Sequence, residues 1–251
     1  MSRSFQLSFR QVTAIVALAT CVLVANATDA ARSRRSARRT NRSNATNCCR
    51  SGQPAPPLFD GRTLDNWTTI AGQPVTTGWE VVDGVIHLNK EQGRAGHIIS
   101  KHEYGDFELT FDWKIAEGGN SGLKYRVRKY GNKTLGCEYQ IYDDEKASNL
   151  PPRGSTGSLY ALYEPNESKQ LNPAGEFNST RIVVCGNWIE HWLNGKRILT
   201  AIVGSPEWDE RVAASKFSNE IEFGENRYGK IMLTDHGSEV WYRNIQLRPL
   251  N

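Results

Sequence analysis

Apolar and polar residues alternate in many short runs after residue 57, most clearly over residues 107–114. In residues 107–114 the odd-numbered positions are Phe107, Leu109, Phe111 and Trp113, and the even-numbered positions are all polar. A period of two is the signature of a strand with one face buried and one face in water. The pattern therefore predicts a half-buried antiparallel strand.

The other runs extend this pattern to an all-β domain. Further strands are predicted at residues 79–82, 85–88, 122–128, 137–142, 181–185, 188–193, 230–234 and 240–247, with hairpin turns at Asp83-Gly84, Gly186-Asn187 and Asn194-Gly195. So many short strands favour a two-sheet antiparallel sandwich over separate domains. One exception is residues 205–216, where Ser205 can cap, Pro206 suits the first turn and acids follow. This segment is predicted to be one short surface helix.

The N-terminus carries an export signal. Arg3 and Arg10 precede the apolar run 12–24, which ends in Ala25-Asn26-Ala27. Thirteen residues rise only ~20 Å as a helix, too short for a membrane span, so residues 1–27 are predicted to be a cleaved signal peptide. A lipoprotein box at residues 18–21 and an organellar transit peptide are the weaker alternatives. The expected location is secreted or periplasmic.

Charge divides the chain. Residues 1–50 contain nine arginines and one acid, whereas residues 51–251 contain 22 basic and 26 acidic residues. An acidic body does not suit duplex binding, so nucleic acid is not expected as a partner. Residues 28–56 have no apolar pattern and are predicted to be a basic, Pro-containing disordered linker, which can attach the protein to an anionic envelope. Residues 57–251 are the predicted domain.

Candidate chemistry lies on the run 137–144. Alternation places Glu138 and Gln140 on the polar face, and Arg126 falls on the polar face of the preceding run. If the two strands pair, Arg126 and Glu138 can meet, and the arginine would favour an ionised carboxylate that serves as a base or a ligand. A plain cross-strand salt bridge is the alternative reading.

A histidine near the C-terminus is the second candidate. His236 follows Asp235 and precedes Gly237, at the end of a predicted strand, where an imidazole can carry protons near neutral pH. A hydrogen-bonded turn histidine is the alternative. His191 shares a face with apolar residues and is interpreted as structural, and nothing beside His97 argues for a role.

These pieces occur in an order that resembles the 3-keto-disaccharide hydrolase domain family, over about residues 57–249. The blocks are LFDGRTLDNW (58–67), GNSG (119–122) with Arg126, EYQIYDD (138–144), GSLY (157–160), PAGEFN (173–178), HWLNG (191–195), LTDHG (233–237) and YRNI (242–245). Two positions depart from the family pattern: Phe177 replaces a usual Trp, and Thr234 replaces a usual Gln.

The resemblance implies a concanavalin A-like lectin/glucanase jelly roll and a secreted bacterial enzyme that cleaves 3-keto-glycosides, either by base-assisted elimination or by hydrolysis. Glu138 and His236 are then the candidate catalytic pair. The candidate substrate ligands are Asn120, Arg126, Gln140, Asp143 and Asp235. The expected partner is an oligosaccharide or a 3-keto-glycoside.

Two other functions stay open. A lectin-like binding module is the first, since the fold does not fix function and Trp67, Trp188, Trp192 and Trp208 are candidates for exposed stacking on sugars. A glucanase-like carboxylate pair, Glu138 with Asp143, is the second. Five strand residues span ~16 Å, whereas a retaining pair needs ~5 Å, so the spacing argues against it.

No cofactor is required by the sequence. A divalent cation is an option at the consecutive acids 143–145, but acids in a loop are usually solvated, so the metal stays unassigned.

Overall fold

The computed structural model describes residues 57–250. The predicted signal peptide, residues 1–27, and the predicted linker, residues 28–56, both lie outside the described residues. The elements are β1 (Trp67–Thr69), β2 (Trp79–Val82), β3 (Val85–Leu88), η1 (Lys90–Gln92), β4 (Ile98–Ser100), β5 (Phe107–Ile115), β6 (Asn120–Tyr130), β7 (Lys133–Tyr142), η2 (Pro152–Gly154), β8 (Asn178–Cys185), β9 (Trp188–Leu193), β10 (Lys196–Ile202), α2 (Pro206–Ala213), β11 (Lys230–Leu233) and β12 (Val240–Pro249).

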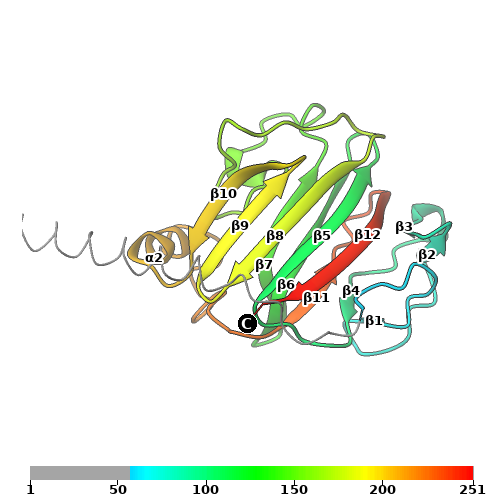
Figure 1. Cartoon of the computed structure of the whole chain (residues 1–251), viewed down its shortest axis with the longest axis horizontal. Coiled ribbons are helices and arrows are strands. Elements are labelled where there is room, and N and C mark those ends of the chain that lie inside the picture. Colours follow the sequence, from blue (N-terminus) through cyan, green and yellow to red (C-terminus); the bar gives the residue numbers. More distant parts are fainter. Residues whose placement is uncertain (1–56, 251) are drawn as a thin grey trace, which may run out of the picture. The chain divides into compact units, whose positions relative to one another are not determined.

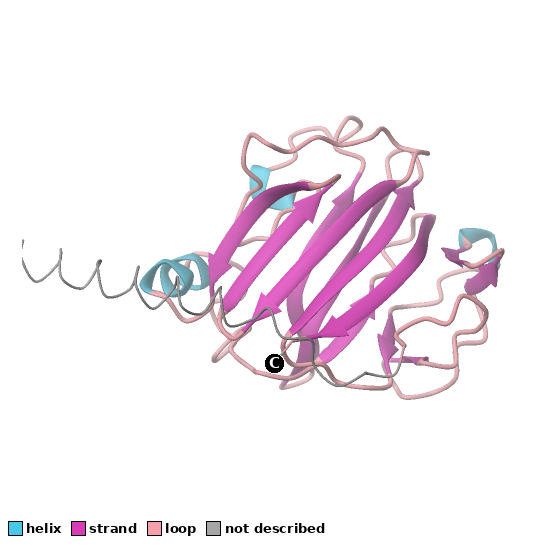
Figure 2. Ribbon diagram, viewed as in Figure 1, coloured by secondary structure: helices cyan, strands magenta, loops and turns pink. Residues whose placement is uncertain are grey.

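The strands form two antiparallel sheets that face each other. One sheet has the order β1-β4-β11-β6-β7, and the other has the order β10-β9-β8-β5-β12-β3-β2. Figure 1 shows the seven-stranded sheet in front of the five-stranded sheet, and Figure 2 shows how little of the described chain is helical. The predicted all-β jelly-roll sandwich is confirmed. No helix within residues 57–250 has the length and apolar character needed to cross a bilayer.

Strand β5 shows why these residues form a sandwich. Its exposure alternates strictly, with Phe107, Leu109, Phe111 and Trp113 at 0–1% exposed. It pairs with β8 on one side and β12 on the other, in the middle of its sheet. Burying each large apolar side chain stabilises the fold by ~1.5–3 kcal/mol relative to exposure, so this central strand contributes substantially to the core. The predicted strand is confirmed.

Other local predictions are also confirmed. The turn residues Asp83 and Asn194 have positive φ angles of 51° and 47°, as two-residue hairpins require. Helix α2 begins after Ser205, whose side chain accepts a hydrogen bond from the Trp208 amide. His191 is completely buried as interpreted: its ring contacts the Gly157 carbonyl and the Tyr125 hydroxyl, and desolvation lowers its pKa to about 4.

The predicted placement of the tryptophans is partly wrong. Trp67 and Trp208, expected on the surface, are each 1% exposed and belong to the core. The reason is tertiary: Trp67 starts the short strand β1, which the sequence did not predict, and Trp208 is the inward position of an exposed helix. Trp192 and Trp241 reach the outer surface, but Arg181 and Lys114 lie over their rings.

A β-bulge in β6 changes the direction of Arg126. The pairing of β6 with β7 shifts between Tyr125 and Arg128, and Arg126 has φ +49°. An extra residue in one strand turns the following side chains, so Arg126 leaves the polar face that simple alternation predicts. Its side chain is instead 1% exposed and bonds Asp106 and the Gly186 carbonyl.

Candidate active site

The candidate site lies on the outer face of the five-stranded sheet. Tyr139 and Ile141 of β7 point into the core, so Glu138 and Gln140 point outward, as predicted. In the register with β6, Lys124 is directly opposite Glu138. Side chains of directly opposite residues lie on the same face and within contact. This face points away from the viewer in Figure 1.

Glu138 is a buried carboxylate between two basic groups. Its side chain is 6% exposed, with Lys124 Nζ 3.5 Å from Oε2 and His236 Nε2 3.9 Å from Oε1. Burial on its own would raise the pKa of Glu138, but His236 and Lys124 outweigh it and hold the pKa below the ordinary value. The carboxylate is therefore ionised at neutral pH.

One oxygen of Glu138 has no hydrogen-bond partner. Oε1 is buried without a donor, and 3.9 Å to His236 is an ion-pair distance, too long for a hydrogen bond. An unmatched buried acceptor costs about 1–3 kcal/mol, more when it is charged. Nine buried side-chain atoms within residues 57–250 lack a hydrogen-bond partner, and Glu138 Oε1 is the carboxylate oxygen among them, so it is the one anionic atom that can accept a proton or a hydrogen bond from a ligand.

His236 stands beside a second imidazole that the sequence did not single out. The rings of His97 and His236 are 5.7 Å apart and meet edge to face. His97 Nδ1 accepts a hydrogen bond from the Asp235 amide at 2.9 Å, so the neutral ring carries its proton on Nε2. Burial, and then the nearby Lys124 and His236, lower the pKa of His97. At neutral pH His97 is therefore an uncharged donor.

No local signal in the sequence could have revealed His97. It lies almost 140 residues before His236 and is brought there because β4 pairs with β11. The loop geometry is then fixed by Asp235, whose two oxygens accept the amides of Gly96 and Gly237 at 2.9 and 2.7 Å.

Two predicted ligands are brought together at the site, and three are not. Gln140 donates to the Asn120 side chain at 2.9 Å on the same sheet face as Glu138. Asp235 is 2% exposed, and both of its carboxylate oxygens accept hydrogen bonds from backbone amides. It therefore fixes the loop and is not positioned as a substrate ligand. Arg126 is turned away by the bulge. Asp143 is 4% exposed and accepts the Gly118 amide at 2.7 Å, which fixes a turn.

This contact with Gly118 gives Asp143 a structural role in a turn, whereas the glucanase-like arrangement requires it to act as a second catalytic carboxylate. The basic side chains nearest to the Glu138 carboxylate are Lys124 and His236. Because Asp143 fixes a turn through the Gly118 amide, the candidate site consists of one carboxylate, Glu138, and its basic neighbours.

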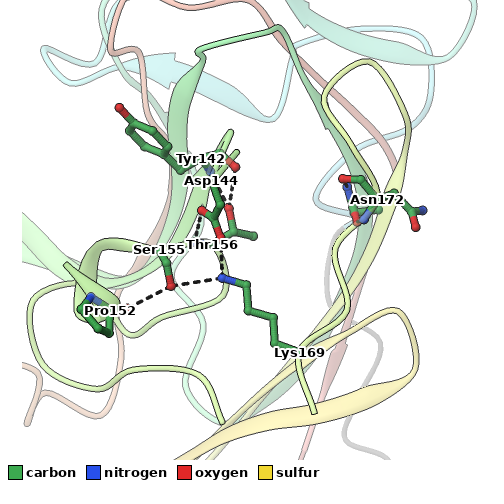
Figure 3. A network of polar contacts seen from close by, with 8 residues as sticks. Tyr142, Asp144, Pro152, Ser155, Thr156, Lys169 and Asn172 are labelled. Carbon is green, nitrogen blue, oxygen red and sulfur yellow. Dashed lines mark hydrogen bonds and ion pairs between the residues drawn. The ribbon is translucent and has the colours of Figure 1, made fainter. Parts of the chain in front are cut away.

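A long loop continues the sheet beyond β7. Its residues 157–160 bond to the edge of β7, including the Tyr160 amide to the Glu138 carbonyl at 3.0 Å. Figure 3 shows the contacts that hold this loop. The Asp144 carboxylate accepts hydrogen bonds from Lys169 and from the Thr156 amide, and Lys169 also donates to the Ser155 hydroxyl.

A further cation, Lys216, lies against this loop near the site. Lys216, which follows α2, has Nζ 4.1 Å from the Tyr160 ring, and its charge helps to lower the pKa of Glu138. Lys216 is therefore a further basic group at the site that sequence reasoning did not identify.

The acids 143–145 do not assemble a metal centre. Asp143 serves the Gly118 amide, and Asp144 serves Lys169 and Thr156. Within residues 57–250, no group of three or more His, Cys, Asp or Glu side chains is placed to hold a metal ion. The structure therefore assigns no metal ligands.

Gly122 makes room for the Glu138 carboxylate, the candidate catalytic group, and this close approach gives a testable prediction. A Cβ on Gly122 would lie 2.5 Å from Glu138 Oε1. Gly122→Ala should therefore displace the carboxylate while the fold is retained. Misplacement by about 1 Å can cost roughly 10²-fold in rate, which we expect in kcat on a cleaved substrate.

The control for this variant is a double-mutant cycle. In the background of Glu138→Gln, adding Gly122→Ala should cost little further activity, because both changes act on one group. Equal losses in the two backgrounds would contradict the assignment.

The fold and this site define a jelly-roll domain with a carboxylate–imidazole site on an open sheet face, an architecture that serves both sugar-binding and sugar-cleaving proteins. The chain belongs to the 3-keto-alpha-glucoside-1,2-lyase-like domain family, whose model matches residues 54–248. The predicted family resemblance is confirmed.

Individual relatives agree with this assignment. The chain is 30% identical over 226 residues to a Bacteroides thetaiotaomicron protein named 3-keto-disaccharide hydrolase, covering 77% of this chain and 78% of that one. It is similar to a crystal structure from Parabacteroides distasonis described as a candidate glycosyl hydrolase, with 32% identity and TM-score 0.69 over 77% of this chain and 93% of the other. A second such structure from that organism shows 30% identity and TM-score 0.61, over 78% and 98%.

Proposed function

We propose that this domain cleaves 3-keto-glycosides by eliminating the group on C1 and then adding water. The observation that carries the proposal is the buried, ionised Glu138, whose Oε1 has no hydrogen-bond partner. The family description, a 1,2-lyase-like domain for 3-keto-α-glucosides, and the name of the Bacteroides relative support the same substrate class.

The ketone makes this chemistry accessible to a carboxylate. A carbonyl at C3 makes the hydrogen on C2 acidic. An ordinary glycoside has no carbonyl there, so its C2 hydrogen is not acidic enough for a carboxylate to remove. Glu138 Oε1 removes that proton as the C2–H bond breaks. The electron pair passes through an enolate at C3 and forms the C1–C2 double bond as the C1–O bond breaks.

The basic residues around Glu138 have complementary roles in this proposal. Lys124, 3.5 Å from the carboxylate, supplies positive charge where the enolate develops, and His97 can donate its Nε2 proton there. His236, with a side chain 35% exposed, gives a proton to the leaving oxygen at the open side of the site. Gln140 and Asn120 hold sugar hydroxyl groups.

Addition of water completes the reaction. Water delivers its hydroxyl to C1 and its proton to His236, and Glu138 returns the first proton to C2. The products are the free leaving group and a 3-keto sugar, so the net reaction is hydrolysis. Both catalytic groups return to their starting protonation states.

A paired-substrate assay tests the proposal. The purified protein is incubated with a chromogenic 3-keto-glucoside and with the corresponding glucoside, each with and without a chelator. We expect release from the keto compound alone. Release from both would instead favour glucanase-type hydrolysis, and release from neither would favour a binding module. Loss of activity with chelator would reveal a metal requirement.

The reaction is placed outside the cytoplasm in this proposal. The charge and apolar pattern of residues 1–27 support export, and the arginines of residues 28–56 support attachment to an anionic envelope. N-terminal sequencing of the mature protein should begin at Thr28. Retention of Met1 would contradict export by a cleaved signal.

A further inference from the structure

A cavity of about 240 Å³ opens on the same five-stranded sheet, apart from the groups described above. Its floor contains Ile99 and Val127, and threonine side chains including Thr68 and Thr134 line its walls. None of the candidate catalytic residues lines it. The cavity has room for one six-membered ring.

The strand register places the cavity and Glu138 on one face. Glu138 is opposite Lys124, Lys124 is opposite Met232, and Met232 is opposite Ile99, which is opposite Thr68. Directly opposite residues share a face, so this row runs across the sheet from the catalytic carboxylate to the cavity wall. Strands are ~4.8 Å apart, which puts Ile99 roughly 14 Å from Glu138.

The side chains between the two are apolar and mostly covered. Ile99, Val127 and Met232, at 7%, 2% and 0% exposed, form a small buried cluster of their own, separate from the main core. Met232 is the partner of Lys124, and Val127 is the partner of Lys230 in β11. Of this cluster, Ile99 and Val127 also line the cavity, so a ring seated there would contact aliphatic side chains.

The rim of the cavity is mainly positive. Arg128, Lys129 and Lys230 line it, and Glu103 is the one acid among the lining residues that the structure describes. Arg128 is already bonded to the carbonyls of Ile221 and Glu222. Neither lysine takes part in the ion pairs found within residues 57–250.

We propose that this cavity binds the leaving-group side of the substrate, and that it favours a ring bearing a carboxylate or sulfate group. This inference rests on the proposed function for its place in the reaction. The ring lies on Ile99 and Val127, its hydroxyl groups meet the threonines, and its acidic group meets Lys129 and Lys230. Uronic acids and phenolic acids both have this chemistry.

Matched leaving groups test the charge preference in the full-length protein. The substrates are 3-keto-glucosides of 4-hydroxybenzoate, of 4-hydroxybenzyl alcohol, of glucuronate and of glucose. We expect the double variant Lys129→Gln/Lys230→Gln to lower kcat/KM for the two acids by about fivefold to tenfold, as for two exposed ion pairs. The neutral substrates should change less than twofold. Comparing variant with wild type on each substrate cancels differences in leaving-group reactivity.

A charge change of opposite sign is the matched control. Glu103→Gln removes the acid from the rim and should raise kcat/KM for the anionic substrates only. A purely structural role for these residues would not make the lysine variant and the Glu103 variant act in opposite directions on the anionic substrates and leave the neutral substrates nearly unchanged. Preference for glucuronate over hydroxybenzoate, or the reverse, distinguishes a sugar from an aromatic acid.

Binding without turnover separates this inference from the proposed function. NMR titration of the protein with free 4-hydroxybenzoate and free glucuronate should perturb signals of residues around Ile99 and Val127. Thr134→Trp, which fills the cavity, should abolish the perturbation. Binding there without cleavage of any keto-glycoside would overturn the proposed function and leave the cavity assignment standing. Cleavage with no charge-dependent effect of the variants would overturn the cavity assignment alone.

Discussion

Replacing Glu138 with glutamine should lower kcat on a 3-keto-glycoside by about 10²–10⁴-fold, the usual contribution of a positioned general base. Glutamine has nearly the same shape but cannot accept the C2 proton. Because Glu138 is 6% exposed, little else can occupy its place, so water should not restore activity. The measurement is steady-state kinetics on the chromogenic 3-keto-glucoside.

The pH dependence checks the protonation state in this prediction. The pKa of Glu138 is below its ordinary value of 4.5, so the carboxylate is ionised over the neutral range. Activity should therefore not decline on account of Glu138 until the solution is more acidic than that value. A matched control is Glu207→Gln, because Glu207 is 63% exposed and pairs with Arg211 on the surface helix. Glu207→Gln should leave kcat unchanged.

The result that would contradict this role is retained turnover in Glu138→Gln with normal KM. Glu138 would then be a structural ion partner of Lys124, as the plain salt-bridge reading supposes. Retained turnover there, combined with a strong loss in His236→Gln, would move the base to the imidazole.

The alternation of apolar and polar residues could predict most of this fold, because the pattern within each strand shows which of its faces is buried. Residues 107–114 lie in one strand with one buried face, and no distant information is needed to place them. The same reasoning placed Glu138 and Gln140 correctly, since β7 has no break between them and the core positions Tyr139 and Ile141.

The site could be predicted only in part because its geometry comes from pairing. His97 meets His236 through the contact of β4 with β11, and Asp235 is used up by loop amides that only the folded chain brings close. Arg126 is harder still. Its bulge has an arginine at positive φ, where glycine would have given a warning in the sequence.

The second large effect concerns Arg126, which the sequence assigned to the substrate and the structure assigns to the fold. Its guanidinium is buried and bonds Asp106 at 2.8 Å and the Gly186 carbonyl at 2.9 Å, while Nε has no partner. Asp106→Ala should destabilise the protein by about 3 kcal/mol, because it leaves a buried cation without its counter-charge. This is the lower end of the range for buried pairs, since the Asp106 side chain is 31% exposed and water can partly replace it.

Removing the Arg126 cation should lower the free energy of unfolding less than removing its partner Asp106. Arg126→Met keeps much of the apolar stem and eliminates the charge, so the double variant Asp106→Ala/Arg126→Met should be more stable than Asp106→Ala alone. Urea unfolding of the three variants measures this order. Kinetics on the same samples separates the two assignments: a fold role leaves KM for the keto-glycoside near the wild-type value in Arg126→Met. A large rise in KM with unchanged stability would instead return Arg126 to the substrate.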